Sequence, residues 1–316
     1  MQQTSLIQSL NHLPCFSNIT HVTSLDSGFS QPCYKVTTSE KNYFVKSNPF
    51  SSLLALTLNQ LAAKNGLSPA IIYQDDNWLV TDFIEGQHLD EYCNEGLIDD
   101  FESFNTKRIQ SAVNLMVKCH KLPITAELQI TNSSPEYLNG NLNNTLIGIE
   151  SLNCLKLCNN LIELTNFPVE KVAKLERFAL LSDNHLQSVL AQMNECNPQK
   201  QLVGCHGDIN FSNVIIASDN TPWLIDFECA SLAPAEFDMA MFIAINTLSE
   251  HETSEALKAY QKTSNHPLLD ETLTQAYLPL CYLINALWYD NASRLHPNAK
   301  TLKIKSEQQW QLINWL

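Results

Sequence analysis

"CHGDINFSNVIIASDNTPWLIDFECA", residues 205–230, holds acidic and amide side chains within an otherwise mostly apolar stretch. Its two β-prone runs, "NVIIAS" and "PWLIDF", flank the turn-forming pair Asp219-Asn220 and predict a β-hairpin. Asp226 stands at the end of the second run, where a buried carboxylate costs free energy unless a partner balances it. The stretch therefore predicts a hairpin that directs Asp226 into a cavity.

Two further polar residues precede this hairpin. Asp208 follows His206 by two positions and Asn213 follows Asp208 by five, so we expect both side chains to face the same cavity as Asp226. Carboxylate and amide oxygens are the ligands that Mg²⁺ prefers, and protein-bound Mg²⁺ recruits phosphates. One carboxylate then remains to accept a proton from a hydroxyl group. The spacing thus predicts a site for magnesium and phosphate.

The composition of the 316 residues is that of an ordinary globular protein, with 44% hydrophobic and 16% charged residues. The formal net charge of −14 disfavours a general nucleic-acid binder, because such a protein needs a basic surface. The same charge modestly favours cationic small molecules as ligands.

The ten cysteines include no CxxC pair, and a chain of this length can build a full hydrophobic core without disulfides. We therefore expect a reducing compartment. The N-terminal "MQQTSLIQSLNHLPCF" lacks the basic and long apolar segments of a signal peptide. The longest apolar run, "LPLCYLINALWY", is too short to span a bilayer. These features predict a cytoplasmic protein with no membrane partner.

The first 84 residues are predicted to be mainly β-structure. Residues 20–46 alternate between β-prone runs and turn residues, which is typical of a three-stranded antiparallel meander. "SSLLALTLNQLAAKNG" predicts a helix with Ser51 or Ser52 as the N-cap and Gly66 just past its end. "AIIYQ" and "NWLVTDFI" predict two further strands. We expect a five-stranded sheet with one helix in residues 1–84.

The remainder, residues 85–316, is predicted to be mainly helical. Apolar residues recur at helical spacing in "SFNTKRIQSAVNLMVKCHKL", and residues 124–147 are rich in Asn, Ser and Thr and predict an exposed loop. Long helical patterns follow over residues 169–196, 234–248, 253–263, 269–291 and 299–315. The chain as a whole predicts an α+β fold in which a small β-rich lobe, 1–84, precedes a large helical lobe, 85–316.

The hairpin stretch belongs to a longer motif. It consists of "HGDINFSN" at residues 206–213, "IDFE" at residues 225–228 and Asp238, twelve residues after Asp226. This motif resembles the signature of the aminoglycoside phosphotransferase and choline/ethanolamine kinase superfamily, which has the two-lobed protein-kinase fold. Glu228, in place of a glycine, is similar to the choline and thiamine kinase branches.

Further segments extend the resemblance over nearly the whole chain: "YFVK", "GLSPAIIY", "LVTDFIEGQHL" and "CHKLP". The resemblance implies ATP and Mg²⁺ as cofactors and a small-molecule alcohol as the acceptor. It implies Asp208 as the catalytic base and Asn213 and Asp226 as metal ligands. The nucleotide-binding residues that it implies are Lys46 and Gly28 for phosphate and the backbone of Asp82 and Ile84 for adenine.

For the acceptor, the resemblance implies Glu228, Trp288 and Asp290 as contacts. A carboxylate and an aromatic face suit an ammonium group, so we expect a cationic amino alcohol such as choline, ethanolamine or thiamine. Trp288 can equally be a core residue, because aromatic residues on apolar helices usually pack inside.

Two alternatives stay open. Other branches of the superfamily phosphorylate aminoglycosides, methylthioribose or homoserine. A pseudokinase-like binding module is the second alternative, because the helix that follows "YFVK" lacks the glutamate that usually pairs with the lysine, and the phosphate loop has only Gly28. The sequence leaves the oligomeric state open.

Overall fold

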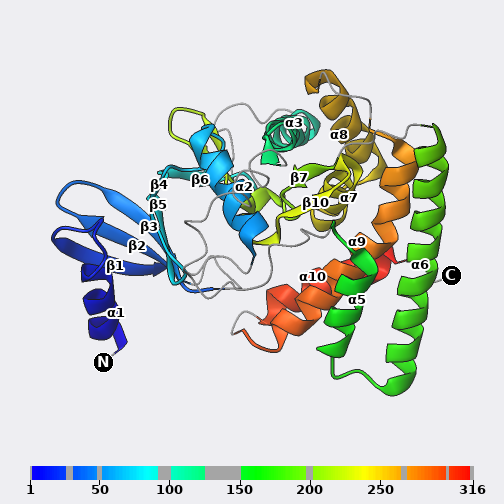
Figure 1. The fold of residues 1–316 in the computed structure, drawn as a ribbon, viewed down its shortest axis with the longest axis horizontal. Coiled ribbons are helices and arrows are strands. Elements are labelled where there is room, and N and C mark those ends of the chain that lie inside the picture. The colour runs from blue at the N-terminus through cyan, green and yellow to red at the C-terminus, as the bar shows by residue number, and fades with distance from the viewer. Residues whose placement is uncertain are drawn as a thin grey trace, which may run out of the picture.

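The computed structural model describes residues 2–25, 31–47, 52–91, 101–124, 151–196, 202–264, 269–296 and 299–313. A two-lobed α+β architecture is visible in Figure 1, with a β-sheet at one end and a group of helices at the other. The predicted loop at residues 124–147 lies outside the described residues except for residue 124.

The N-terminal lobe is built on a five-stranded sheet, as predicted. Its strand order is β1-β2-β3-β5-β4, and all neighbouring strands are antiparallel. The strands are β1 (Ile19–Leu25), β2 (Cys33–Thr38), β3 (Asn42–Ser47), β4 (Ile71–Gln74) and β5 (Trp78–Asp82). Alternating side chains of β2 and β3 are buried, as expected for a sheet with one covered face.

A helix that the sequence analysis did not assign packs on this sheet. Helix α1 (Gln2–Asn11) contributes Leu10, which shares a core cluster with Val22, Val36 and Val45 of the strands. The described residues of the N-terminal lobe therefore contain two helices, where the sequence predicted one. Helix α1 is short and lacks a strong N-cap signal, so its sequence contains few features that predict a helix.

Helix α2 (Leu53–Lys64) is the predicted helix, with Ser52 as its N-cap and Gly66 at φ +66° beyond its end. Its apolar side chains belong to the core of the C-terminal lobe instead of the core of the sheet. Leu58 approaches Gly204 so closely that a Cβ atom on Gly204 would lie 2.8 Å from Leu58 Cδ1. Helix α2 thus connects the two lobes, between the sheet and the helical group (Figure 1).

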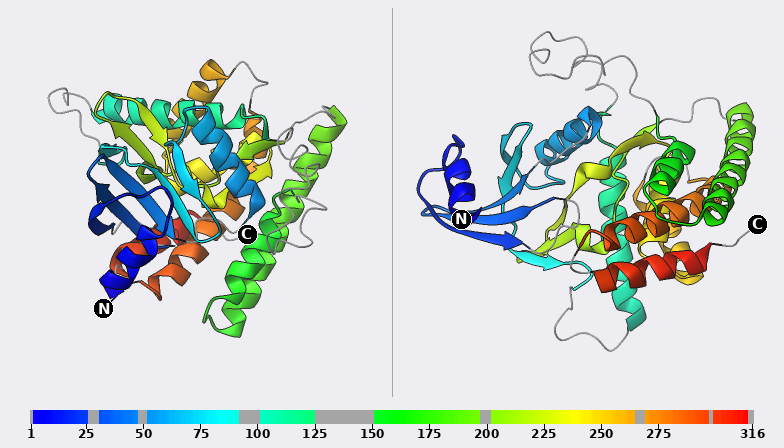
Figure 2. Two further views of the ribbon diagram at one scale, coloured as in Figure 1. Left: turned by 60° about the vertical axis from the view of Figure 1, so that its left-hand side comes forward. Right: turned by 90° about the horizontal axis from the view of Figure 1, so that it is seen from below.

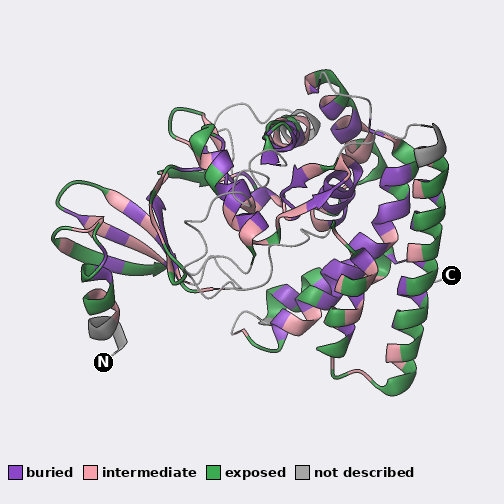
Figure 3. Ribbon diagram, in the orientation of Figure 1, coloured by how far each residue is buried: buried purple, intermediate pink, exposed green. Residues whose placement is uncertain are grey.

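The C-terminal lobe contains the predicted helices and one more. They are α3 (Phe101–His120), α5 (Cys154–Glu163), α6 (Val169–Cys196), α7 (Ala235–Ile245), α8 (Glu250–Thr263), α9 (Glu271–Ser293) and α10 (Ala299–Leu312). Only α5 was not expected. Helices α7 and α9 form the centre of the lobe and are mostly buried, whereas α6 exposes one side (Figure 3).

Two small sheets lie where the lobes meet. One has the order β6-β8-β9, with β6 (Gly86–His88), β8 (Val214–Ala217) and β9 (Pro222–Leu224); the other pairs β7 (Val203–Cys205) with β10 (Ser231–Ala233). Strands β8 and β9 form the predicted hairpin. The predicted lobe boundary at residue 84 lies in the connection between β5 and β6, and it stays a prediction.

The additional views show α1 against the sheet at one end of the molecule and α6 at the opposite end (Figure 2). Among the described helices, none contains an apolar stretch that could cross a bilayer. Among the described residues, eight cysteines are free thiols.

Candidate active site

The loop between β7 and the 3₁₀ helix η2 (Phe211–Asn213) makes a tight turn at Gly207. Gly207 has φ +78°, a conformation that side chains with a Cβ atom rarely adopt. A Cβ atom there would also lie 2.4 Å from the carbonyl oxygen of Cys229. Glycine at position 207 is therefore favoured by both backbone conformation and space.

Replacing Gly207 with alanine should lower the free energy of unfolding by more than Gly66→Ala does. Both glycines have positive φ, so each substitution carries a backbone strain of about 1–2 kcal/mol. No atom lies within 4 Å of a Cβ on Gly66, whereas the Gly207 substitution adds the collision with Cys229. Urea unfolding of both variants measures the difference, and equal losses would contradict the proposed close approach.

Asp238 holds this turn from helix α7. Its carboxylate is fully buried and accepts hydrogen bonds from the backbone N–H groups of His206 (3.0 Å) and Gly207 (2.8 Å). His120 Nε2, at the end of α3, lies 2.9 Å from the same carboxylate. Burial by itself raises the pKa of Asp238, but these hydrogen bonds and the nearby histidines outweigh it and lower the pKa. Asp238 therefore anchors the loop between β7 and η2 as an ionised group.

His120, Cys205 and Asp238 lie close enough together to suggest a metal site. Each potential ligand atom is already hydrogen-bonded, however: His120 Nδ1 contacts the hydroxyl of Tyr260 at 2.9 Å, and the Cys205 thiol donates to the Ala233 carbonyl. Burial, reinforced by the charge of Asp238, also raises the pKa of the Cys205 thiol. This cluster is a structural anchor.

His206 orients the loop from the opposite side. Its Nε2 donates to the carbonyl oxygen of Ile225 (3.0 Å), and its Nδ1 accepts from the backbone N–H of Asp208 (3.2 Å). The ring also packs edge-on against Phe227. Burial lowers the pKa of His206, which keeps the imidazole neutral. A structural role for His206 follows from these contacts.

Two residues that the sequence analysis missed complete the support of the loop. Asn246, just past the end of α7, accepts from the Phe211 N–H (3.0 Å) and donates to the Ile209 carbonyl (3.0 Å). His88 Nδ1 lies 2.6 Å from the carbonyl oxygen of Ser212. The sequence does contain one feature that could have identified Asn246: it is a polar residue directly after the apolar helix α7.

Asp208 is held by amide groups on both of its oxygens. Asn210 Nδ2 donates to Oδ1 (2.9 Å) and Asn213 Nδ2 donates to Oδ2 (2.7 Å). Burial, reinforced by the charge of Asp226, raises the pKa of Asp208 to about 7 despite these hydrogen bonds. Such a carboxylate is suited to accept a proton near neutral pH.

Asp226 lies beside Asn213 because β8 and β9 pair in a register that joins Val214 to Leu224. The Ile225 N–H also donates to the Asn213 carbonyl (3.0 Å). Asp226 has φ 66° and ψ 69°, in the left-handed region, and its Oδ1 accepts from Lys46 Nζ at 2.7 Å. The structure thus brings the predicted residues of the hairpin and of strand β3 together.

The site fits a magnesium ion by the chemistry of its donors. Asn213 uses its Nδ2 group for Asp208, and no described residue donates a hydrogen bond to its Oδ1. Asp226 Oδ2 likewise has no hydrogen-bond donor among the described residues. An amide oxygen and a carboxylate oxygen are ligands that Mg²⁺ accepts while it keeps several waters. Asn213 and Asp226 are therefore the residues that would hold the metal.

The residues predicted to receive adenine lie at the connection between the lobes. The Asp82 N–H donates to the Ala70 carbonyl (3.0 Å), and the Asp82 carboxylate forms an ion pair with Lys41. The N–H of Ile84 has no acceptor among the described residues. Both adenine contacts stay predictions, and Gly28, predicted at the phosphate loop, lies outside the described residues.

Contacts among four side chains join this connection to the sheet. Lys35 Nζ lies 2.8 Å from Glu85 Oε1 and 4.1 Å from the centroid of the Phe83 ring. Asn42 Nδ2 donates to the same Glu85 oxygen (3.1 Å). Because the ion pair is exposed, it contributes little to stability, about 0–1 kcal/mol. Its effect is to orient the segment that follows β5.

Of the predicted acceptor contacts, Glu228 binds inside the site: its Oε2 lies 2.8 Å from Lys46 Nζ. Trp288 on α9 is 36% exposed, which is unusual for a core residue. Its ring packs edge-on against Tyr289, which is buried. Burial and the nearby charge of Asp208 both raise the pKa of Tyr289. Tyr289 is therefore within electrostatic reach of Asp208.

Asp290 lies on another side of α9. Its Oδ2 is 4.0 Å from Arg294 Nε, one turn further along the helix. The negative charge of Asp290 also reaches Lys171 of α6. Burial lowers the pKa of Lys171, and the charge of Asp290 partly offsets this lowering. The acceptor contacts of Glu228, Trp288 and Asp290 stay predictions.

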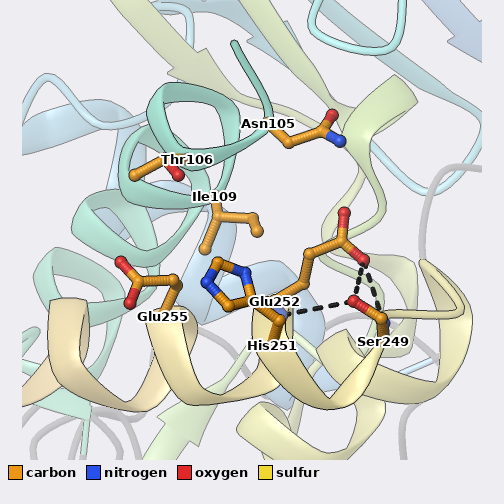
Figure 4. A pocket seen from close by; sticks show the side chains of 7 residues that line it. All are labelled: Asn105, Thr106, Ile109, Ser249, His251, Glu252 and Glu255. Carbon is orange, nitrogen blue, oxygen red and sulfur yellow. Dashed lines mark hydrogen bonds between the residues drawn. The ribbon is translucent and has the colours of Figure 1, made fainter. Parts of the chain in front are cut away.

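A separate pocket of about 290 Å³ lies between α3 and α8. Figure 4 shows Asn105, Thr106 and Ile109 of α3 facing His251, Glu252 and Glu255 of α8. None of the predicted site residues lines it. The pocket is thus distinct from the group formed by Lys46, Asp208 and Asp226.

Comparison with known proteins identifies the class of this chain. Residues 21–272 match the model of the phosphotransferase enzyme family, and the chain belongs to that family. No curated protein matches the sequence.

Solved structures show the same fold at low sequence identity. An ethanolamine kinase from Plasmodium vivax has a TM-score of 0.64 at 14% identity, covering 92% of this chain and 81% of its own. The choline kinase LicA from Streptococcus pneumoniae has a TM-score of 0.63 at 16% identity, covering 98% of each chain. A spectinomycin phosphotransferase in complex with ADP and spectinomycin has a TM-score of 0.56 at 14% identity, covering 98% and 94%. The two-lobed kinase-like fold is confirmed.

Proposed function

We propose that this protein is an ATP- and Mg²⁺-dependent kinase that phosphorylates a hydroxyl group of a small cationic alcohol, in the class of choline, ethanolamine or thiamine. The observation that carries the proposal is the convergence of Lys46, Asp208, Asn213 and Asp226 in one site. These residues come from β3, the catalytic loop and the β8–β9 hairpin. Their types are those that phosphoryl transfer requires.

Each residue would have a defined task. Asp208 would orient the acceptor hydroxyl and accept its proton, for which its pKa of about 7 is suited. Lys46 would neutralise phosphate charge. Asn213 and Asp226 would hold Mg²⁺, which would supply positive charge to offset the charge that develops on the phosphates. Positioning and electrostatic stabilisation would supply most of the rate enhancement.

The choice of a cationic acceptor has two supports. The chain has a formal net charge of −14, and Trp288 keeps part of its surface exposed on the same helix that places Tyr289 near Asp208. An exposed aromatic face favours contact with a weakly hydrated ammonium. The names of the structural neighbours, ethanolamine kinase and choline kinase, agree with this class.

A second acceptor class is supported by the spectinomycin phosphotransferase among the neighbours. Aminoglycosides, methylthioribose and homoserine therefore belong in the same test. A pseudokinase-like module is less well supported. Helix α2 contains no acidic residue, but Lys46 still has acidic partners in Asp226 and Glu228.

The test is a transfer assay on the purified chain with Mg²⁺ and ATP. We expect acceptor-dependent ADP release and a phosphorylated product, detected by mass spectrometry, with at least one of choline, ethanolamine and thiamine. A product only from an aminoglycoside, methylthioribose or homoserine would assign another branch of the family. ATP binding without transfer to any of these alcohols would favour the binding module.

Replacing Trp288 with leucine should raise KM for the acceptor with little change in melting temperature. At 36% exposure, Trp288 buries less surface than a core tryptophan, whose truncation costs about 3–5 kcal/mol. A lost cation–π contact would weaken binding by about 0.5–2 kcal/mol. Trp310→Leu is the matched control, because Trp310 packs on Phe167 and is not one of the predicted acceptor contacts. A steep fall in melting temperature with unchanged acceptor KM would show that Trp288 is a core residue.

A further inference from the structure

Phe211 is the one apolar side chain of the short helix η2, which reads Phe-Ser-Asn. Its ring is buried and makes two specific contacts. The guanidinium carbon Cζ of Arg108, on α3, lies over this ring at 4.1 Å from the centroid. The ring of Phe242, on α7, packs edge-on against it with the two centroids 5.7 Å apart. Helix η2 is therefore attached through this side chain to two helices of the C-terminal lobe.

Arg108 is half-buried and keeps its charge there. Burial by itself lowers the pKa of Arg108, but the charges of Glu252 on α8 and of Asp90 oppose this lowering. An arginine side chain stays protonated in proteins, and a cation–π contact is stronger when the cation is desolvated. The guanidinium is thus a permanent cation over the Phe211 ring.

Helix η2 needs support from its surroundings because it has only three residues. A 3₁₀ helix has poor hydrogen-bond geometry, and a helix this short is not stable by itself. Its last residue, Asn213, donates hydrogen bonds to the carboxylate (2.7 Å) and the carbonyl (2.9 Å) of Asp208. Asn213 is also a proposed metal ligand. A shift of η2 would therefore displace a metal ligand and a partner of the proposed base together.

The other supports of η2 act on backbone groups. Asn246 accepts a hydrogen bond from the Phe211 N–H (3.0 Å), and His88 Nδ1 lies 2.6 Å from the Ser212 carbonyl oxygen. Helix α3 makes neither of these backbone contacts. Arg108 adds a contact to the side chain, so the main chain and the ring of Phe211 are held from different elements.

We propose that Arg108 is a positioning residue for the candidate active site: its guanidinium holds the Phe211 ring and thereby fixes η2, which carries Asn213. The inference rests on the proposed function and deepens it, because it gives a residue of α3, outside the predicted site residues, a task in aligning the metal ligand and the base.

Arg108→Met keeps an apolar stem and removes the cation. Hydrogen exchange measured by NMR should then be about 2- to 30-fold faster at the N–H groups of Phe211 and Asn213, the size of one lost cation–π contact. The N–H groups of His206 and Gly207 donate to Asp238 and are the internal control, which should exchange as in wild type. Unchanged exchange at Phe211 and Asn213 would overturn the proposal.

The transfer assay measures the effect on catalysis. Arg108→Met should lower kcat by about 3- to 30-fold and raise the Mg²⁺ concentration for half-maximal rate, while KM for the acceptor stays unchanged. Arg108→Lys keeps the charge without the planar guanidinium, so its loss should be smaller. Lys107→Met, which removes an exposed cation from the neighbouring position of α3, is the matched control and should match wild type. A lower melting temperature with unchanged kcat and Mg²⁺ dependence would show a purely structural contact and overturn the proposal.

A double-mutant cycle shows whether Arg108 acts through Phe211. Phe211→Leu removes the ring and should lower kcat by itself. Adding Arg108→Met should then cause little further loss, because the ring that the guanidinium holds is already gone. Fully additive losses in the double variant would overturn the proposal.

Calorimetric titration with ATP, with and without Mg²⁺, separates the two levels of inference. Wild type should bind ATP more tightly with Mg²⁺, and Arg108→Met should lose about 3-fold or more of that difference. If wild type shows no such difference, the proposed function fails and this inference with it. If wild type shows it and Arg108→Met keeps it in full, only the role of Arg108 fails. Should Arg108→Met not fold, judged by circular dichroism, Arg108→Lys takes its place in the same titration and should reduce the difference; an unchanged difference would overturn the proposal.

Discussion

Replacing Asp208 with asparagine should lower kcat by about 10²- to 10⁴-fold, the range that a positioned general base contributes. Asparagine has nearly the same shape, and its Oδ1 can still accept from Asn210 or Asn213. The loop should stay anchored, because its other hydrogen bonds run from the backbone to Asp238 and Asn246. The variant should therefore lose the proton acceptor and keep the fold and the ATP affinity.

Steady-state kinetics with the acceptor found in the transfer assay measures this loss. Asp219→Asn, in the exposed turn of the same hairpin, is the matched control and should retain wild-type kcat. A preserved kcat with a large loss of ATP affinity in Asp208→Asn would contradict the base assignment and give Asp208 a binding role.

Replacing Asp226 with asparagine should abolish Mg²⁺-dependent ATP binding and lower turnover by about 10²- to 10³-fold, the cost of removing one preorganised electrostatic group. Asparagine tolerates the left-handed conformation that Asp226 adopts, so the backbone can stay in place. Lys46 would still be paired with Glu228. The main loss in Asp226→Asn is the negative charge that would hold the metal.

Titration with ATP, with and without Mg²⁺, gives the decisive comparison for this variant. Wild type should bind ATP more tightly with Mg²⁺, and Asp226→Asn should lose that difference. Turnover equal to wild type would end the assignment of Asp226 as a metal ligand. The melting temperature serves as the control, since a folded variant is needed for either conclusion.

The strands and most helices were predictable because they depend on local patterns. Helices α6 and α9 follow apolar spacing over more than twenty residues, and α8 begins with a capping box at Ser249. Helices α1 and α5 were missed, as were the three-residue strands β6, β7 and β10. Such short elements are stabilised mainly by their neighbours, and this contribution is absent from their own sequence.

The candidate site was predictable in part. The offsets of Asp208, Asn213 and Asp226 identified the catalytic loop and the hairpin, and the structure brings these residues together. Asn246 was not identified, because its partners Ile209 and Phe211 lie more than thirty residues earlier in the chain. The acceptor side of the site stays a prediction on the residues of α9.

The sequence alone determined which residue types are available for chemistry, since the spacing of the polar residues in 206–228 is covalent and local. Only the tertiary structure decided the partner of Lys46. Helix α2 contains no acid that could pair with it, and the ammonium lies against Asp226 and Glu228, 180 and 182 positions away. Packing of α2 on the 3₁₀ helix η3 (Phe227–Cys229) and the left-handed turn at Asp226 create that contact. Ion pairing depends on distance in space and on burial, and neither can be read from separation along the chain.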